Sequence, residues 1–345
     1  MVLASHHTEM KMQLGFGARD QFGKQPSYNE LRKKISNRTT LSEFLLLGFS
    51  DVRELQILHF VVFLVIYLVG MTRNLLIITA VALDQYLHTP MYFFLMNLSI
   101  IDLSSISVTI LKSMINSLMN TRVISYPGCV TQVFFFVIFI AVDIALLTIM
   151  AHDRYVTICQ PLHYERRMNR IACVQMTVSA WITGIVYSAV YTGNTFKLPF
   201  YQSNVINQFF CEIPQLLKLT CSNSYLSEVG GNAFIVFLVL NYFVFIIVSD
   251  VQIYKAVLRI RSQQGRCKAF SNCPPHLTVV SLMFLTGIFD YLKPTSSSAS
   301  SLDLVVDVLC SLVPPVMNPI IYSMRNTEIK AALNKLIVWR LFTKN

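Results

Sequence analysis

Seven long apolar stretches follow one another along the 345-residue chain. A helix needs about 20 apolar residues to cross the ~30 Å hydrocarbon core of a bilayer. The polar segments between the stretches are too short to fold as domains of their own. The pattern therefore predicts an all-α membrane protein, a single bundle of seven transmembrane helices over residues 57–83, 91–115, 130–152, 173–195, 229–258, 275–292 and 304–323.

Polar segments flank the predicted bundle, a tail over residues 1–56 and a second tail over residues 324–345. Residues 1–36 are polar and mixed in charge, which is typical of disorder. They contain no apolar core of the kind that a cleavable signal peptide needs. We therefore expect the first span to act as its own insertion signal.

Composition and charge agree with a membrane protein and give its orientation. Hydrophobic residues make up 54% of the chain and charged residues only 13%, whereas soluble domains carry about 25% charged residues. The segments after the third, fifth and seventh spans hold 14 Lys and Arg, against five in the opposite short loops. Short cytoplasmic loops are enriched in these residues. We expect a multi-pass plasma-membrane protein with its N-terminus outside and its C-terminus in the cytoplasm.

The net charge of +10 is thus a signal of topology, and we expect no nucleic-acid partner. No segment interleaves basic and aromatic residues as a groove for single strands would. Asn37 begins an Asn-Arg-Thr glycosylation motif in the predicted outer tail.

Eight cysteines are present, and three of them fall on the predicted outer side. Cys129 lies at the outer end of the third span, while Cys211 and Cys221 lie in the long loop before the fifth. The outer compartment permits disulfides, and a Cys129–Cys211 bond would tether this loop to the bundle. Alternatively, all eight cysteines are small buried hydrophobic residues. Spacing alone leaves both open.

Polar residues interrupt four of the spans at comparable depths: Arg73 with Asn74, Asp102, Asp143, and Asn318 with Pro319. Ionisable groups inside a membrane usually face the bundle interior. They form either a cation or proton site or simple hydrogen-bonded links between helices. Asp102 and Asp143 would repel one another unless a cation or proton lay between them, which favours the first interpretation. Pro319 predicts a distorted seventh span, which is either a passive kink or a moving part.

Four separated motifs occur in one order along the chain: LHTPMYFFLMNLSIIDL at 87–103, MAHDRYVTICQPLHY at 150–164, KAFSNCPPHLTVV at 268–280 and PPVMNPIIYSMRNTEIKAAL at 314–333. With them the chain resembles an olfactory receptor of the rhodopsin-like G-protein-coupled class. The resemblance runs from about residue 37 to about residue 333. It implies an amphipathic helix after the seventh span and a disulfide between Cys129 and Cys211.

The resemblance also implies a G-protein switch at Asp153, Arg154 and Tyr155. In this switch, Arg154 pairs with Asp153 in the resting receptor and leaves it to contact a heterotrimeric G protein on activation. A sodium-and-water site is implied at Asn74, Asp102, Asp143 and Asn318, so that a sodium ion is the expected allosteric modulator, with no other cofactor or metal. The moving end of the seventh span would be Asn318, Pro319 and Tyr322.

The ligand pocket implied by the resemblance lies between the outer halves of spans three, five and six. It would accept a small, mostly apolar odorant, since such pockets are lined mainly by apolar groups. Binding would activate a stimulatory G protein and raise cyclic AMP. The residues at helical spacing that would line the pocket are Phe136, Val137, Ile140, Ala141, Phe284, Gly287, Ile288 and Tyr291.

The chain departs from the family pattern at several positions. Arg73 replaces Gly, and we expect it to pair with Asp102 and displace the cation. His152 replaces Tyr and, if charged, would compete with Arg154 for Asp153. Asp250 replaces a Tyr whose hydroxyl supports the active state. Two further departures are Tyr201, which stands in place of a cysteine and leaves Cys221 without that partner, and the added pair Pro274-Pro275.

Other function classes remain as alternatives. An enzyme is not expected, because the chain has no Gly-rich phosphate loop, zinc-binding HExxH or Gly-x-Ser-x-Gly elbow. A transporter or channel could use buried Asp residues, but transporters commonly contain repeated halves, and this chain shows no such repeat. A receptor with a role outside olfaction, or one that couples poorly, is the third possibility.

Overall fold

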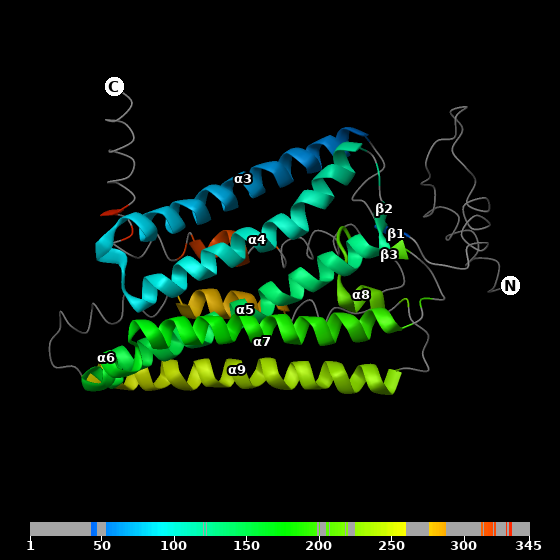
Figure 1. Cartoon of the computed structure of the whole chain (residues 1–345). Helices are drawn as coiled ribbons and strands as arrows, with labels where there is room; N and C mark the ends of the chain where they lie inside the picture. The colour runs from blue at the N-terminus through cyan, green and yellow to red at the C-terminus, as the bar shows by residue number, and fades with distance from the viewer. Residues whose placement is uncertain are drawn as a thin grey trace, which may run out of the picture.

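Five long helices dominate the computed structural model (Figure 1). They are α3 (Arg53–Leu83), α4 (Pro90–Met119), α5 (Tyr126–Cys159), α7 (Arg170–Lys197) and α9 (Tyr225–Arg259). Each contains a stretch that is long and apolar enough to cross a membrane. The structure describes residues 43–46, 53–119, 121, 123–198, 200, 205–206, 208–217, 219, 225–259, 276–287, 312, 314–319, 321, 329 and 331–332.

These helices confirm the first five predicted spans as helical segments, and most extend past the predicted ends. The largest extension is in α5, which continues from the predicted end at residue 152 to Cys159. Of the sixth and seventh predicted spans, the described residues are helical at 276–287 and at 312, 314–319 and 321. The remainder of both spans lies outside the described residues.

Short polar residues fix where two of the helices begin. The Ser125 side chain accepts a hydrogen bond from the backbone N–H of Gly128 at the start of α5. Asn169 does the same for Ala172 at the start of α7. Such caps satisfy backbone donors that have no partner within the helix. Between α5 and α7 the chain forms a 3-10 turn, η2 (Pro161–His163), and the single-turn helix α6 (Tyr164–Arg167).

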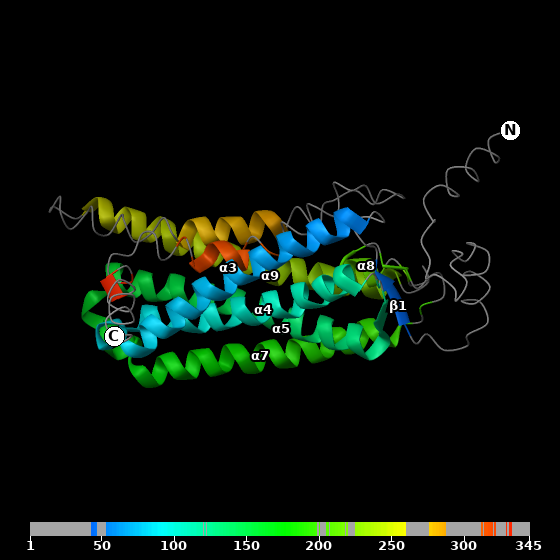
Figure 2. The ribbon, with the colours of Figure 1, turned by 90° about the horizontal axis from the view of Figure 1, so that it is seen from above.

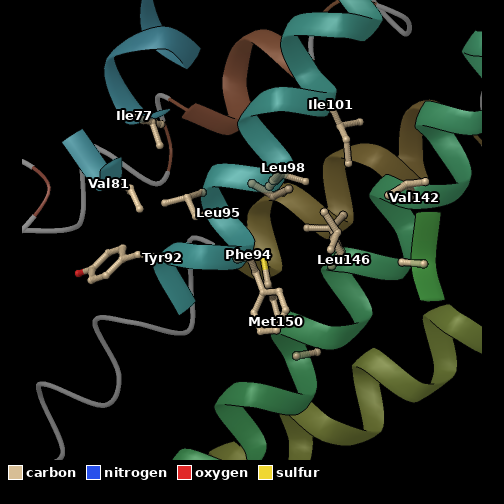
Figure 3. Packing of buried hydrophobic residues seen from close by; sticks show 14 of the residues in the cluster. Ile77, Val81, Tyr92, Phe94, Leu95, Leu98, Ile101, Val142, Leu146 and Met150 are labelled. Atoms are coloured by element: carbon tan, nitrogen blue, oxygen red, sulfur yellow. The ribbon is translucent and has the colours of Figure 1, made fainter. Parts of the chain in front are cut away.

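Helix α5 lies at the centre of the bundle and packs against α4, α7 and α9, while α3 packs against α4 (Figure 2). The largest apolar cluster is built around these contacts. Figure 3 shows Phe94 and Leu98 of α4 beside Met150 and Leu146 of α5. Outward-facing positions of α3, α7 and α9 carry many exposed Val, Leu and Ile side chains, as expected for helices that contact lipid.

A three-stranded sheet at one end of the bundle was not predicted from the sequence (Figure 1). Its central strand β1 (Glu43–Leu46) runs antiparallel to β2 (Val123–Ser125) and parallel to β3 (Val205–Ile206). Phe44 of β1 is fully buried and packs on the ring of Tyr126. A strand from the N-terminal tail therefore joins two loops over this end of the bundle, which we call the disulfide end. The opposite end, where α5 meets η2, is the Arg154 end.

Two glycines allow the helices to approach closely. A Cβ atom added at Gly70 of α3 would lie 3.0 Å from Ile106 of α4 and 3.3 Å from Val316. One added at Gly184 of α7 would lie 2.7 Å from Val142 of α5. Small residues at such crossings let helices pack tightly in membranes.

We predict that Gly184→Val destabilises the protein, because its side chain would force α5 and α7 apart. Overpacking of this kind typically costs roughly 1–3 kcal/mol. The melting temperature of detergent-solubilised protein should fall accordingly. Gly193→Val is the matched control in the same helix, since no atom lies within 4 Å of its Cβ position. Equal melting temperatures for the two variants would contradict this account of the α5–α7 contact.

Candidate functional site

Three groups of predicted site residues lie along α5. The disulfide and its loop lie at one end, Arg154 and its neighbours lie at the other, and the buried polar residues around Asp143 lie between them. At the disulfide end, Cys129 near the start of α5 is bonded to Cys211, which precedes α8 (Ile213–Leu217), with a Cα–Cα distance of 5.6 Å. This confirms the expected disulfide. The bond places residues 208–211 against the disulfide ends of α4 and α5.

Gln132 of α5 holds this loop by hydrogen bonds to two different segments. Its side-chain amide donates to the Val108 carbonyl of α4 at 2.8 Å, and its oxygen accepts from the backbone N–H of Cys211 at 2.9 Å. The Ser113 hydroxyl of α4 donates to the Phe209 carbonyl at 2.9 Å. Hydrogen bonds between buried groups of this kind favour one arrangement of the loop.

Two phenylalanines of the same loop point into the bundle and contact helices on either side. The Phe209 ring stacks on Phe63 of α3 with centroids 5.9 Å apart. The Phe210 ring packs edge-on against Phe136 of α5 at 5.3 Å. Phe136, which was predicted to line the ligand pocket, is therefore in contact with the loop that the disulfide anchors.

The other predicted pocket residues have different surroundings. Phe284 in the helix over residues 276–287 packs on Phe243 of α9, with ring centroids 4.4 Å apart. Ala141 lies near Gly184, at the contact of α5 with α7. Val137 is half-buried, and Ile140 and Gly287 are exposed. Ile288 and Tyr291 lie outside the described residues.

The predicted buried polar site is assembled from three helices and the segment at 314–319. The side-chain amide of Asn318 donates to both carboxylate oxygens of Asp102, at 3.2 Å each. The Asn74 amide donates to the Gly70 and Pro315 carbonyls, at 3.0 and 3.3 Å. Asp143 of α5 lies close enough to Asp102 for their charges to interact. Pro319 follows Asn318 and is buried.

Three buried oxygens around this site accept no hydrogen bond from the residues that the structure describes. They belong to the side chains of Asn74, Asp143 and Asn318. Carboxylate and amide oxygens are the ligands that hard cations take. The donor set therefore fits a small cation. Over the same part of the chain, no three His, Cys, Asp or Glu side chains gather as a metal cluster.

The expected pairing of Arg73 with Asp102 is wrong. Arg73 is exposed on the outside of α3, whereas Asp102 is buried and bonded to Asn318. Successive residues of a helix point in directions about 100° apart, so Asn74 faces the interior and Arg73 does not. Arg73 therefore leaves the buried site unobstructed.

At the Arg154 end, Asp153 is buried and accepts a hydrogen bond from the Tyr164 hydroxyl of α6 at 3.1 Å. Burial, and then the charge of Asp153, raise the pKa of Tyr164 above its ordinary value. The hydroxyl therefore keeps its proton at physiological pH and remains a donor. No role was predicted for Tyr164, although it is the last residue of the motif at 150–164.

Arg154 is only 7% exposed, although it lies near the end of the span. Its charge acts on Asp153, on Asp250 of α9 and on His276 at the start of the next described helix. Tyr155 is half-buried and accepts a hydrogen bond from Gln160 at 3.3 Å. The predicted switch residues thus lie where α5, α9 and the helix over residues 276–287 come together.

His152 is half-buried and lies beside the Tyr155 ring, with centroids 6.4 Å apart. Asp153 takes its described side-chain hydrogen bond from Tyr164. The competition of His152 with Arg154 for Asp153 stays a prediction. The remaining predicted positions, Asn37, Tyr201, Cys221, Pro274, Pro275 and Tyr322, lie outside the described residues.

The sequence did not single out Leu162 in η2, which is 95% exposed. It follows Pro161 and precedes the exposed side chains of Arg166 and Arg167 in α6. A large apolar side chain so fully exposed beside basic residues is a candidate contact for another protein. Its exposure could not be predicted from the sequence, because apolar residues are common throughout this chain.

Comparison with known proteins gives one consistent result. Residues 63–340 match the olfactory receptor family. The human olfactory receptor 14C36 is 48% identical over 320 residues, which cover 90% of this chain and all of that protein. Human olfactory receptor 14J1 is 46% identical over 87% of this chain and 94% of its own length. Human olfactory receptor 14I1 is 48% identical over 90% of this chain and 98% of its own.

We predict that Gln132→Leu lowers the melting temperature and the amount of protein at the cell surface. The substitution leaves the buried N–H of Cys211 without its acceptor, and an unsatisfied buried group costs about 1–3 kcal/mol. Thr131→Val is the matched control, because Thr131 is exposed and bonds only to Pro127 of its own helix. If the two variants melt together, Gln132 does not hold the loop.

Proposed function

Because the chain belongs to the olfactory receptor family, we propose that it binds a small, mostly apolar odorant within its helix bundle. Binding activates a stimulatory heterotrimeric G protein and raises cyclic AMP. Members of this family are signalling receptors rather than enzymes, and they are multi-pass proteins of the plasma membrane. The orientation that we propose has seven spans, with the disulfide end outside and the Arg154 end in the cytoplasm. The excess of Lys and Arg on one side supports this orientation.

The observation that carries this proposal is the position of α5. Its first turns are bonded to Cys211 and contact Phe210, and its last turns carry the buried Arg154. The helix has 34 residues and therefore spans about 50 Å at 1.5 Å per residue. One rigid element thus connects the proposed ligand region with the proposed G-protein region.

The apolar character of the disulfide end supports the ligand class. Phe63, Phe209, Phe210 and Phe136 form a continuous series of ring contacts from α3 to α5. Phe243 and Phe284 make a second pair between α9 and the following described helix. Aromatic surfaces of this kind bind apolar molecules by burial and ring contact.

The Arg154 end supports the G-protein contact. Leu162 projects there with 95% of its surface exposed, beside the exposed Arg166 and Arg167. An apolar anchor with a basic rim suits a partner that has an apolar pocket with acidic surroundings. In this proposal Asp153, Arg154 and Tyr155 form the switch, and Asn318, Pro319 and Tyr322 form the moving end of the seventh span.

A sodium ion is the modulator that we propose for the buried polar site. Asp102 and Asp143 would supply the charge, and Asn74 and Asn318 would supply amide oxygens. When bound, the ion offsets the repulsion between the two carboxylates. Because the ligands come from α3, α4, α5 and the segment at 314–319, a bound cation would hold these elements in one arrangement.

We predict that wild-type protein, expressed in cells without cyclic-nucleotide-gated channels, answers at least one member of a broad odorant panel with a rise in cyclic AMP. No ligand-dependent current should accompany it. Arg154→Gln should abolish the rise at equal surface amounts, because the G-protein switch is lost. A current without cyclic AMP would favour the channel interpretation. Silence of wild type that reaches the surface would contradict the proposed function.

The ligand region is tested in the same assay with a matched pair of variants. Phe136→Ala should raise the half-maximal odorant concentration about ten-fold, the factor that corresponds to a loss of ~1.4 kcal/mol. Phe135→Ala should leave it unchanged, because Phe135 lies on another side of α5 and is exposed. Equal shifts in both variants would exclude Phe136 from the ligand site.

We predict that sodium chloride raises the melting temperature of the purified wild type relative to choline chloride at the same ionic strength. Asp143→Asn should remove this difference, because it removes one of the two carboxylates that attract the cation. Ser104→Ala is the control in α4, since the Ser104 hydroxyl bonds to Ile100 of its own helix. A sodium effect that survives in Asp143→Asn would place the ion elsewhere.

A further inference from the structure

We propose that Asp250 is the counter-charge that keeps Arg154 within the bundle, so that signalling requires the two residues to separate. This inference rests on the proposed function only for its consequence in signalling. The pairing itself is a property of the fold and can be measured without a G protein.

Asp250 occupies an apolar stripe of α9 that faces the interior. Ile246, Ile253 and Val257 are almost completely buried on the same face, at spacings of three and four residues around it. Asp250 itself is 8% exposed. Helical periodicity therefore directs this acid toward the bundle and away from lipid.

Arg154 occupies the corresponding position on α5, the helix against which α9 packs. It follows Leu147 and Met150 along the buried face, seven and four residues later. The Leu147 carbonyl accepts a hydrogen bond at 2.9 Å from Nε2 of His276. This bond brings the helix that begins at His276 against the same part of α5.

Two carboxylates, those of Asp153 and Asp250, feel the charge of Arg154, and they differ in their other partners. Asp153 has a second stabilising partner, because one of its oxygens accepts a hydrogen bond from the Tyr164 hydroxyl. His276 brings no negative charge. Both oxygens of Asp250 are buried and accept no hydrogen bond within the described part of the chain. Such a carboxylate is costly unless an opposite charge stabilises it, and Arg154 lies within electrostatic range.

The pairing explains why Arg154 and Asp250 are both buried near the end of a bundle where water is close. Charge attraction between them is poorly screened in a site with little water. It joins α5 to α9 and keeps the guanidinium turned inward. A G protein can contact Arg154 only after this attraction has been overcome, so Asp250 sets how often the unliganded receptor signals.

The first test measures basal cyclic AMP per receptor at the cell surface. Asp250→Asn should raise it roughly five-fold or more, the lower end of typical coupling between sites, because a neutral amide holds Arg154 less firmly. Ser249→Ala is the matched control, since the neighbouring Ser249 hydroxyl bonds to Phe245 of its own helix. A merely structural role for Asp250 would instead lower the signal, and a lower or unchanged signal in folded Asp250→Asn overturns the proposal.

The second test is a double-mutant cycle of melting temperatures in detergent for Arg154→Gln, Asp250→Asn and the double variant. Each single change should lower the melting temperature, and the double change should cost less than their sum, because each single variant leaves one buried charge alone. Asp250→Glu should melt above Asp250→Asn, since it keeps the charge. Strictly additive effects overturn the pairing.

The two tests separate failure of this inference from failure of the proposed function. A coupled cycle without cyclic AMP in any variant supports the pairing and counts against the signalling pathway. If Asp250→Asn does not reach the membrane, the pairing predicts that adding Arg154→Gln restores surface expression. Absence of that recovery overturns the proposal.

Discussion

The high cost of a polar group in hydrocarbon is the constraint on which the rest of this structure depends. Backbone groups must be satisfied within each helix, and polar side chains must turn toward one another. Asp102 therefore meets Asn318, and Gln132 meets both Val108 and Cys211. These links converge on the interior around α5 because it is the helix that contacts α4, α7 and α9. Apolar packing holds the bundle together, while the few polar links determine which faces of the helices meet.

The positions of the first five helices follow from the sequence alone, because the length of an apolar stretch is a local property. Their ends were harder to predict, because a helix continues past the hydrocarbon until a cap or a turn stops it. The sheet could not be predicted, because strands of four, three and two residues carry almost no pattern. They form only when β1 of the N-terminal tail is brought to the loops at β2 and β3.

The sequence predicted which residues gather in one site more reliably than it predicted which residue contacts which partner. Asn74, Asp102, Asp143 and Asn318 do gather in space, but Arg73, adjacent to Asn74 in the sequence, lies outside them. At the Arg154 end, Asp153 is hydrogen-bonded to Tyr164 of α6, a partner that the sequence did not indicate. The wrong pairing of Arg73 has a simple physical cause. Neighbouring residues on a helix point in directions about 100° apart, so adjacency in the sequence does not imply a shared partner.

The same geometry connects the ends of the receptor. A change at the disulfide end is transmitted through α5 only if the helix can occupy two arrangements relative to its neighbours. Along its length the contacts differ in kind. Near Cys129 they are covalent and hydrogen-bonded, and near Gly184 they are tightly packed. At the Arg154 end, charges act beside the hydrogen bonds of Tyr164 and His276, and the Asp250 carboxylate forms no hydrogen bond with a described residue. We therefore expect rearrangement to cost least at the Arg154 end, where the G protein is proposed to bind, while the disulfide holds the opposite end around the proposed ligand region.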